Sequence, residues 1–221
     1  MRKMRRVVAN TFVTLDGVMQ APGGPDEDPS GGFKHGGWVF PYWDDELDRR
    51  MESFMGKPFD LLLGRRTYEI FAAHWPHQKD AAADALNRAK KHVASRTLKT
   101  VEWENSELLQ GDVAQAVARL KAEAGPEIQV HGSGNLLQTL FSAGLVDLFT
   151  LWIFPVVVGG GKRLFENGVT PRGLKLVDQA VSSTGVVTCS YEPAGDVPHG
   201  SFAMETPSPE EIERRRKLAA E

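Results

Sequence analysis

Cysteine and long apolar runs are both scarce in this chain of 221 residues. The single cysteine, Cys189, cannot form an internal disulfide, which excludes a disulfide-stabilised secreted fold and fits a reducing compartment. The longest apolar run, residues 148–158, is too short to span a bilayer. The N-terminal segment lacks the apolar core and the small-residue cleavage site of a signal peptide. These absences predict a cytoplasmic protein that does not bind a membrane.

An excess of charge of one sign is also missing. The 26 Lys and Arg residues nearly balance the 29 Asp and Glu residues, for a net charge of −3 at pH 7. No global positive field attracts nucleic acid, so we expect a small molecule as the partner. The chain lacks the Gly-x-Ser-x-Gly elbow of hydrolases and the zinc motif of deaminases. His74 and His77 have metal-like spacing, but Pro76 prevents a regular helix from presenting both rings, and no metal site is predicted.

Strand and helix patterns alternate along residues 5–192, which predicts an α/β domain over residues 1–192. The predicted strands are 5–14, 59–63, 92–95, a brief 101–103, 127–131, 147–158, and a final antiparallel pair at 174–181 and 185–192. Residues 20–43 form a long Gly- and Pro-rich loop with five aromatic residues, and we expect it to cover a binding site. Residues 193–221 are a polar extension, with a helix expected from Pro209 after the cap Ser208.

The turn Gly64-Arg65-Arg66-Thr67 joins a predicted strand to a predicted helix. Free backbone N–H groups and the positive end of the helix dipole make such a turn suitable for a phosphate. Two arginines at a helix N-terminus oppose the dipole, and a bound anion would relieve that conflict. Two solvated arginines are the alternative interpretation.

A second turn of this kind is Gly132-Ser133-Gly134-Asn135, which follows the strand that ends at His131. It begins like a dinucleotide fingerprint, but Leu137 stands at the third glycine position and no acidic residue follows about 20 positions later. An ordinary Rossmann domain is therefore disfavoured. The run Gly159-Gly160-Gly161-Lys162 is not a Walker A motif, because Arg163 replaces the required Ser or Thr. We expect a structural role for His131.

Five segments in characteristic order carry a family resemblance. They are Leu15-Asp16-Gly17-Val18, residues 62–69 (LLGRRTYE), Ser95-Arg96-Thr97, residues 130–134 (VHGSG) and residues 155–165 (PVVVGGGKRLF). In this combination the chain resembles the dihydrofolate reductase-like superfamily. Within it, the chain is most similar to the branch that contains the reductase domain of the bifunctional deaminase-reductase of riboflavin synthesis. The resemblance implies an α/β fold with a mostly parallel sheet of about eight strands, flanked by helices, with an antiparallel strand near the end.

The resemblance also implies NADPH as the cofactor, bound across the carboxyl edge of the sheet. Gly64, Arg65, Arg66 and Thr67 would meet its phosphates, and Ser95 and Arg96 its adenosine side with the 2′-phosphate. Gly132, Ser133, Gly134, Asn135 and Leu136 would hold the pyrophosphate at the start of a helix. Three arginines near these phosphates fit NADPH better than NADH on charge.

The substrate side implied by the resemblance includes three acidic residues. Asp16 ends the first strand, where the family places nicotinamide and substrate, and we expect it to donate a proton or orient the substrate. Beside an apolar nicotinamide pocket its pKa would be raised. A turn-forming Asp-Gly pair is the alternative. Asp45 or Glu46 falls near the acidic residue that holds the pterin in dihydrofolate reductase.

The leading hypothesis is an NADPH-dependent reductase that transfers hydride to a small heterocyclic, pterin- or pyrimidine-like, or carbonyl substrate. The alternative is a non-catalytic NADP-binding module for sensing or scaffolding. We also expect a homodimer, because residues 148–154 carry more apolar bulk than one sheet face of a lone domain readily covers, and the resemblance points the same way.

Overall fold

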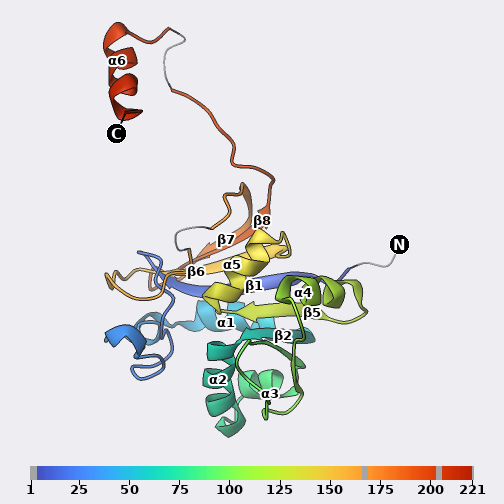
Figure 1. Ribbon diagram of the computed structural model, residues 1–221. Coiled ribbons are helices and arrows are strands. Elements are labelled where there is room, and N and C mark those ends of the chain that lie inside the picture. The colour runs from blue at the N-terminus through green and yellow to red at the C-terminus, as the bar shows by residue number, and fades with distance from the viewer. Residues whose placement is uncertain (1–3, 166–168, 203–205, 221) are drawn as a thin grey trace.

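The computed structural model describes residues 4–165, 169–202 and 206–220. Its centre is an eight-stranded sheet in the order β4-β3-β2-β5-β1-β6-β8-β7 (Figure 1). The strands are β1 Val7–Thr14, β2 Phe59–Gly64, β3 Lys91–Ala94, β4 Ser106–Leu108, β5 Glu127–His131, β6 Leu148–Phe154, β7 Leu174–Val181 and β8 Val187–Pro193. Strands β1 to β6 pair in parallel, and β8 pairs antiparallel with both β6 and β7. The predicted fold class is confirmed.

Helices cover both faces of this sheet. They are α1 Asp45–Met55, α2 Arg65–His74, α3 Ala81–Arg88, α4 Val113–Ala122, α5 Gly134–Ser142 and α6 Pro209–Leu218, with short 3₁₀ turns at Ser30–Gly32, Phe40–Tyr42 and Trp75–His77. Helices α4 and α5 bury their apolar sides in one core cluster, with alternate residues of β1, β2 and β5. Helices α1, α2 and α3 pack in two further clusters with the other set of strand residues, as the alternation of strand side chains requires.

The direction of the crossovers reverses at β5. The chain moves from β1 to β2 to β3 with α1, α2 and α3 on one face, and it returns through α4, β5 and α5 on the other face. Open α/β sheets bind their ligands at such a switch point, outside the carboxyl ends of the strands. A ligand site is therefore expected at the neighbouring ends of β2, β5 and β1.

Two predicted strand positions need correction. The short fourth strand lies at Ser106–Leu108, not at 101–103. The reason is the hydroxyl of Tyr68 in α2, which accepts hydrogen bonds from the backbone N–H groups of Glu102 (2.9 Å) and Trp103 (3.1 Å) and so removes these donors from any ladder. Strand β6 ends at Phe154 rather than continuing to 158, because Pro155 has no N–H to donate.

The apolar side chains of β6 do not support a homodimer. Phe149, Trp152 and Phe154 are at most 2% exposed, because the core clusters on the two faces of the sheet bury them within one chain. Exposed apolar side chains lie instead on the edge strand β7, at Leu174, Leu176, Val177 and Val181. A dimer stays a prediction, without support from β6.

The polar extension differs from the domain in packing. Helix α6 begins at Pro209, as expected, and stands clear of the sheet at the end of an extended segment (Figure 1). It has no buried residue, and Glu211 and Glu213 form ion pairs with arginines of the same helix. In the described part of the chain no helix is long and apolar enough to cross a membrane.

Candidate cofactor and substrate site

The α-helices begin in two different ways. Four of them, α1, α3, α4 and α6, have side-chain caps, in which Asp44, Asp80, Asp112 and Ser208 accept a hydrogen bond from a first-turn N–H group. Helices α2 and α5 have Gly64 and Ser133 at the N-cap position, with no side-chain cap and no acidic residue in the first turn. The first-turn N–H groups of these two helices are therefore available to an anion.

The two uncapped helix starts are in contact. The backbone N–H of Gly64 donates to Ser133 Oγ (3.0 Å), and that hydroxyl donates to Thr67 Oγ1 (2.7 Å). A Cβ at Gly64 would lie 3.2 Å from the Ser133 side chain, a tight contact that glycine avoids. Gly132 and Ser133 both have positive φ, 61° and 64°, which turns the chain sharply into α5. The structure thus joins the two glycine turns that the sequence predicts separately.

Of the other predicted phosphate-binding residues, Arg65, Arg66 and Thr67 belong to the first turn of α2, which starts at Arg65. Gly134, Asn135 and Leu136 form the first turn of α5, in which Asn135 is exposed and Leu136 is buried. Ser95 and Arg96 follow β3, the strand next to β2. The Ser95 hydroxyl accepts bonds from the N–H groups of Thr97 (3.1 Å) and Leu98 (3.0 Å), so its first role is to shape this turn.

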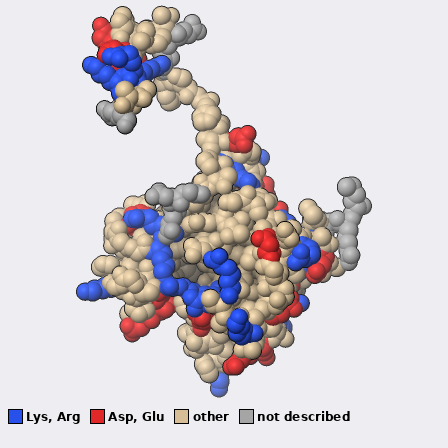
Figure 2. Space-filling view, in the orientation of Figure 1, with Lys and Arg blue, Asp and Glu red and all other residues tan. Residues whose placement is uncertain are grey.

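Most of the cations near these turns already have partners. Arg65 pairs with Glu69 (3.0 Å), and Arg66 donates to Ser30 Oγ (2.9 Å). Lys162 pairs with Asp28. Arg96 is exposed and has no partner among the described residues. Figure 2 shows basic side chains gathered around a hollow on the side of the domain that faces the viewer.

The long loop, residues 20–43, is held by Lys162 and Arg66 through Asp28 and Ser30. The Lys162 ammonium donates to the carboxylate of Asp28 and to Ser30 Oγ (2.7 Å), and Arg66 approaches the same Asp28 at 3.7 Å. Asp28 thus lies close to two cations. Partial burial acts to raise the pKa of Asp28, but hydrogen bonds from Lys162 and Ser30 hold it below the usual value. The aromatic part of the loop lies elsewhere: Trp38 and Trp43 pack on Phe154 and Trp152 of the sheet.

Asp16 is held in a turn by several donors. Thr14 Oγ1 donates to its carboxylate at 2.6 Å, and the N–H groups of Val158 (3.3 Å) and Gly159 (2.9 Å) donate to it as well. These bonds, that from Thr14 above all, lower the pKa of Asp16. The expected raised pKa is wrong, and an ionised carboxylate of this kind is a poor proton donor at neutral pH.

Asp45 and Glu46 have no hydrogen bond or ion pair with the glycine turns in the described part of the chain. The start of α1 lies beside the β7–β8 turn, where its cap Asp44 accepts a bond from the Ser183 N–H (2.9 Å). Asp45 is exposed, and Glu46 pairs with Arg49 (2.7 Å). The long loop before α1 decides this placement, which sequence spacing alone does not reveal.

His131 at the end of β5 is a candidate that sequence reasoning missed. Its ring lies against Phe54 of α1 (centroids 5.6 Å apart) and Phe71 of α2 (6.3 Å), at the switch point of the sheet. Burial lowers the pKa of His131 to about 4, so the imidazole is neutral at physiological pH. A histidine immediately before the Gly132 turn was the sequence signal, but its ring neighbours come from distant segments.

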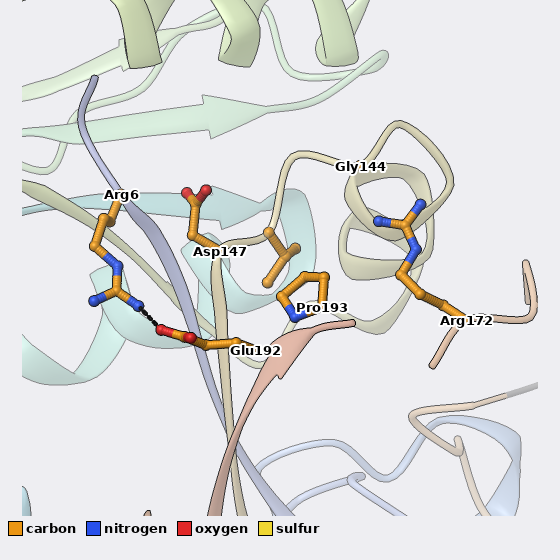
Figure 3. A pocket seen from close by; sticks show the side chains of 7 residues that line it. Arg6, Gly144, Asp147, Arg172, Glu192 and Pro193 are labelled. Carbon is orange, nitrogen blue, oxygen red and sulfur yellow. Dashed lines mark hydrogen bonds and ion pairs between the residues drawn. The ribbon is translucent and has the colours of Figure 1, made fainter. Parts of the chain in front are cut away.

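A hollow of about 470 Å³ opens at the opposite edge of the sheet (Figure 3). It is lined by Arg6, Gly144, Val146, Asp147, Arg172, Glu192 and Pro193. Arg6 pairs with Glu192 (3.1 Å), and Asp147 accepts bonds from Lys121 (2.5 Å) and from the Val7 N–H (2.7 Å). Its charges mostly neutralise one another within the chain, so we place the candidate site at the carboxyl edge.

Comparisons with known proteins agree with this architecture. An uncharacterized Bacillus subtilis protein, YyaP, is 28% identical over 198 residues, which cover 86% of this chain and 95% of YyaP. A pyrimidine reductase-like protein from Corynebacterium diphtheriae matches with a TM-score of 0.61 at 13% identity, over 87% of this chain and 93% of its own. Dihydrofolate reductase from Enterococcus faecalis, complexed with NADP(H), matches with a TM-score of 0.55 at 14% identity, over 85% and 96% of the two chains.

These two solved structures are similar to this chain in fold, at sequence identities of 13% and 14%. The model of the RibD C-terminal domain matches residues 5–189, which include every strand from β1 to β7 and the first three residues of β8. On that match, the chain belongs to the RibD C-terminal domain family.

Proposed function

We propose that this protein is an NADPH-dependent reductase that transfers hydride to a C=N or C=O bond of a small heterocyclic, pyrimidine- or pterin-like, or carbonyl substrate. The observation that carries the proposal is the pair of uncapped helix starts. Among the described α-helices only α2 and α5 lack a side-chain cap, and these two contact each other at the switch point of the sheet. Two adjacent sets of free N–H groups suit a pyrophosphate.

The cations around this pair favour a phosphorylated dinucleotide. Arg65 and Arg66 stand at the start of α2, and Arg96 follows the neighbouring strand. In the proposed complex the first turns of α2 and α5 hold the pyrophosphate, and Arg96, which has no partner in the described structure, meets the 2′-phosphate. An arginine fork binds phosphate with two charge-assisted hydrogen bonds, which NADH would not offer at this position.

The bound cofactor would supply the hydride, and the chain would supply position and a water-poor surface. Asp16 holds the N–H groups of Val158 and Gly159 and the side chain of Arg163 beside the end of β1. Since its carboxylate stays ionised, we assign it to positioning of this segment beside the substrate rather than to proton donation. The E. faecalis reductase, which shares the fold, is complexed with NADP(H), and this supports the choice of cofactor.

Calorimetric titration of the purified protein with NADPH and with NADH tests the proposal. We expect NADPH to bind more tightly, and Arg96→Ala to reduce that preference by about 10- to 150-fold, since a charged hydrogen bond contributes roughly 1.5–3 kcal/mol. Arg88→Ala, at an exposed arginine of α3, is the matched control and should leave both affinities unchanged. Equal affinity of the unmutated protein for the two cofactors would contradict the proposal.

Turnover separates an enzyme from a binding module. Oxidation of NADPH is followed at its absorbance band with a panel of oxidised pterins, pyrimidines and small carbonyl compounds. A reductase oxidises the cofactor with at least one of them. Stoichiometric NADPH binding without oxidation across the panel would instead support the non-catalytic alternative.

A further inference from the structure

The hollow at the amino edge of the sheet contains an arginine that has no counter-charge among the described residues. Arg172 forms one wall of this hollow, across from the ion pair between Arg6 and Glu192 (Figure 3). It is half-buried, and it has no hydrogen bond or ion pair with a described residue. The other two cations here are paired, Arg6 with Glu192 and Lys121 with Asp147. The hollow therefore carries one uncompensated positive charge.

Backbone hydrogen bonds hold the chain at Arg172 in place. The next residue, Gly173, is buried and donates its N–H to the carbonyl oxygen of Gly195 at 2.8 Å. Its own carbonyl oxygen accepts from the N–H of Ala194, also at 2.8 Å. These bonds fix the segment directly after Arg172 beside the end of β8. The guanidinium thus extends from a fixed point of the backbone, which reduces the conformational entropy that a ligand would have to remove.

The C-terminal end of α5 lies next to this guanidinium but does not use its donors. A Cβ at Gly144 would lie 3.5 Å from Nη1 of Arg172, so the two are neighbours. An arginine at such a place can donate to the last carbonyl groups of a helix. In α5, however, the carbonyl oxygen of Phe141 accepts from the Gly144 N–H (3.0 Å), and that of Leu140 accepts from the Leu145 N–H (2.9 Å). The donors of Arg172 therefore stay available to a ligand.

Between the charged walls the hollow is apolar. Val146, 3% exposed, and Pro193 line it, and Pro193 lies between Glu192 and Arg172 (Figure 3). Its volume of about 470 Å³ is in the range of small-molecule sites. A ligand with one anionic group and an apolar body matches both parts of this surface.

We propose that the hollow is a second binding site, for a small monocarboxylate with an apolar body. The carboxylate accepts two parallel hydrogen bonds from the guanidinium fork of Arg172, and the body of the ligand covers Val146 and Pro193. The site lies at the edge of the sheet opposite the joined glycine turns, so its ligand and the cofactor can be bound at the same time. This inference does not depend on the proposed function.

The charges of the hollow disfavour other classes of ligand. Asp147 and Glu192 place two carboxylates in its walls, so a phosphate or a polyanion would meet repulsion from both and find one free cation. Inorganic phosphate also has no apolar part to cover Val146. An uncharged ring covers that side chain but leaves Arg172 without an anionic partner. A monocarboxylate with an apolar body satisfies both conditions.

The experiment titrates the protein at pH 7 with benzoate, benzamide and inorganic phosphate, and it follows the backbone amide resonances by NMR. Benzamide keeps the shape of benzoate without its charge, and phosphate keeps an anion without the ring. The unmutated chain is compared with Arg172→Gln, with Glu192→Gln and with the control Arg119→Gln, which changes an exposed arginine of α4 outside the hollow. Thermal melting of each variant shows whether it is folded.

We expect benzoate to shift the amide resonances of Gly144, Val146 and Asp147, and to bind about tenfold or more tightly than benzamide or phosphate. Arg172→Gln should weaken benzoate binding by about tenfold or more, the range expected for a hydrogen bond between charged groups, and Arg119→Gln should leave it unchanged. Glu192→Gln should strengthen it by about two- to fivefold, because this change removes a like charge and releases Arg6 from an exposed ion pair.

The proposal is overturned if benzoate shifts none of these resonances up to its solubility limit, if benzamide or phosphate binds as tightly as benzoate, or if folded Arg172→Gln keeps the affinity of the unmutated protein. If Arg172→Gln does not fold, Arg172→Lys keeps the charge but loses the planar fork, and an unchanged benzoate affinity in that variant would contradict the contact.

A repeat of the benzoate titration with saturating NADPH separates the two sites. We expect the same benzoate affinity with and without the cofactor. Competition between them would place benzoate at the carboxyl edge and overturn this inference. A protein that does not bind NADPH but binds benzoate through Arg172 would overturn the proposed function alone.

Discussion

The two edges of the central sheet use their polar side chains in opposite ways. At the amino edge of β2 and β3, His92 has both ring nitrogens engaged, with Glu107 (2.8 Å) and Asp60 (3.4 Å), and the same Asp60 pairs with Arg5. At the carboxyl edge, His131 has one bare nitrogen and Arg96 has no partner in the described structure. Both edges are rich in charge, but among the described α-helices the two uncapped helix starts lie at the carboxyl edge.

This contrast separates stabilisation from binding. Polar groups that satisfy one another within the chain hold strands in register, and they have little left to offer a ligand. Uncapped helix starts and an unpaired arginine are tolerated at the surface because water solvates them until a ligand arrives. Hence the hollow at the amino edge, with its paired Arg6 and Glu192, is a weaker candidate for the cofactor than the joined glycine turns.

The largest expected effect lies at the amino edge. Asp60→Asn removes the carboxylate that pairs with Arg5, whose side chain is 4% exposed, and leaves a buried guanidinium without its counter-charge. We expect the free energy of unfolding to fall by about 3–5 kcal/mol. Urea denaturation measures it, and NADPH affinity of the folded protein should not change.

Asp178→Asn is the control for that comparison. It breaks the pair between Arg50 and Asp178 (2.9 Å), in which the aspartate is 56% exposed, and it should cost at most about 1 kcal/mol. Equal losses in the two variants would contradict the assignment of the amino edge to stability.

A fall in pH should lower the free energy of unfolding through protonation of His131. Its folded pKa of about 4 lies below the usual 6.5, so the unfolded chain binds the proton more readily. The stability that depends on a neutral His131 is complete above pH 6.5 and is lost as the pH falls towards 4. Between pH 7 and 4 the unmutated protein should lose about 3 kcal/mol more than His131→Asn, as measured by urea denaturation at each pH.

Carboxylates titrate over the same range in both proteins, so only the difference between them reports on His131. Parallel pH curves for the two proteins would show that the imidazole is protonated in the folded state without penalty.

A negative charge introduced at the start of α5 tests whether this helix start binds a phosphate. Asn135→Asp places a carboxylate in the exposed first turn, where the helix dipole favours it, so the protein should be slightly more stable. The same charge would repel a phosphate bound at this turn. Two like charges about 5 Å apart repel by about 3 kcal/mol at an effective dielectric constant of 20, so NADPH affinity should fall by about a hundredfold. Calorimetric titration measures the loss.

Gln115→Glu in α4 makes the equivalent change in a helix capped by Asp112. It should leave NADPH affinity as it is. A loss of affinity in both variants would mean that the effect is general to the domain and not specific to the uncapped helix.

Asp16→Asn is expected to destabilise the protein less than Asp60→Asn does. It weakens hydrogen bonds from Thr14 and from two backbone N–H groups, and the free energy of unfolding should fall by about 1–3 kcal/mol. The turnover number should fall less than tenfold, because a carboxylate with a lowered pKa is not the proton source. A loss of 10²–10⁴ in rate with unchanged melting, the range typical of a general acid, would show the opposite.

The sequence by itself determined the order of strands and helices and both glycine turns. These features depend on local pattern: β-branched runs at 5–14, an Asp112 cap before an amphipathic segment, and glycine where the backbone must turn. The resemblance carried by five short motifs supplied the arrangement of the sheet, and the family match over residues 5–189 agrees with it.

Only the tertiary structure decided which polar groups form hydrogen bonds with one another. The Tyr68 hydroxyl accepts a hydrogen bond from the backbone N–H of Trp103, 35 positions away. The N–H groups of residues 158 and 159 add to the bond from Thr14 that lowers the pKa of Asp16. The tautomer of His131 depends on a carbonyl oxygen of Phe54, through Gln129. Hydrogen bonds and pKa values depend on distances across the fold, and residue spacing along the chain does not contain those distances.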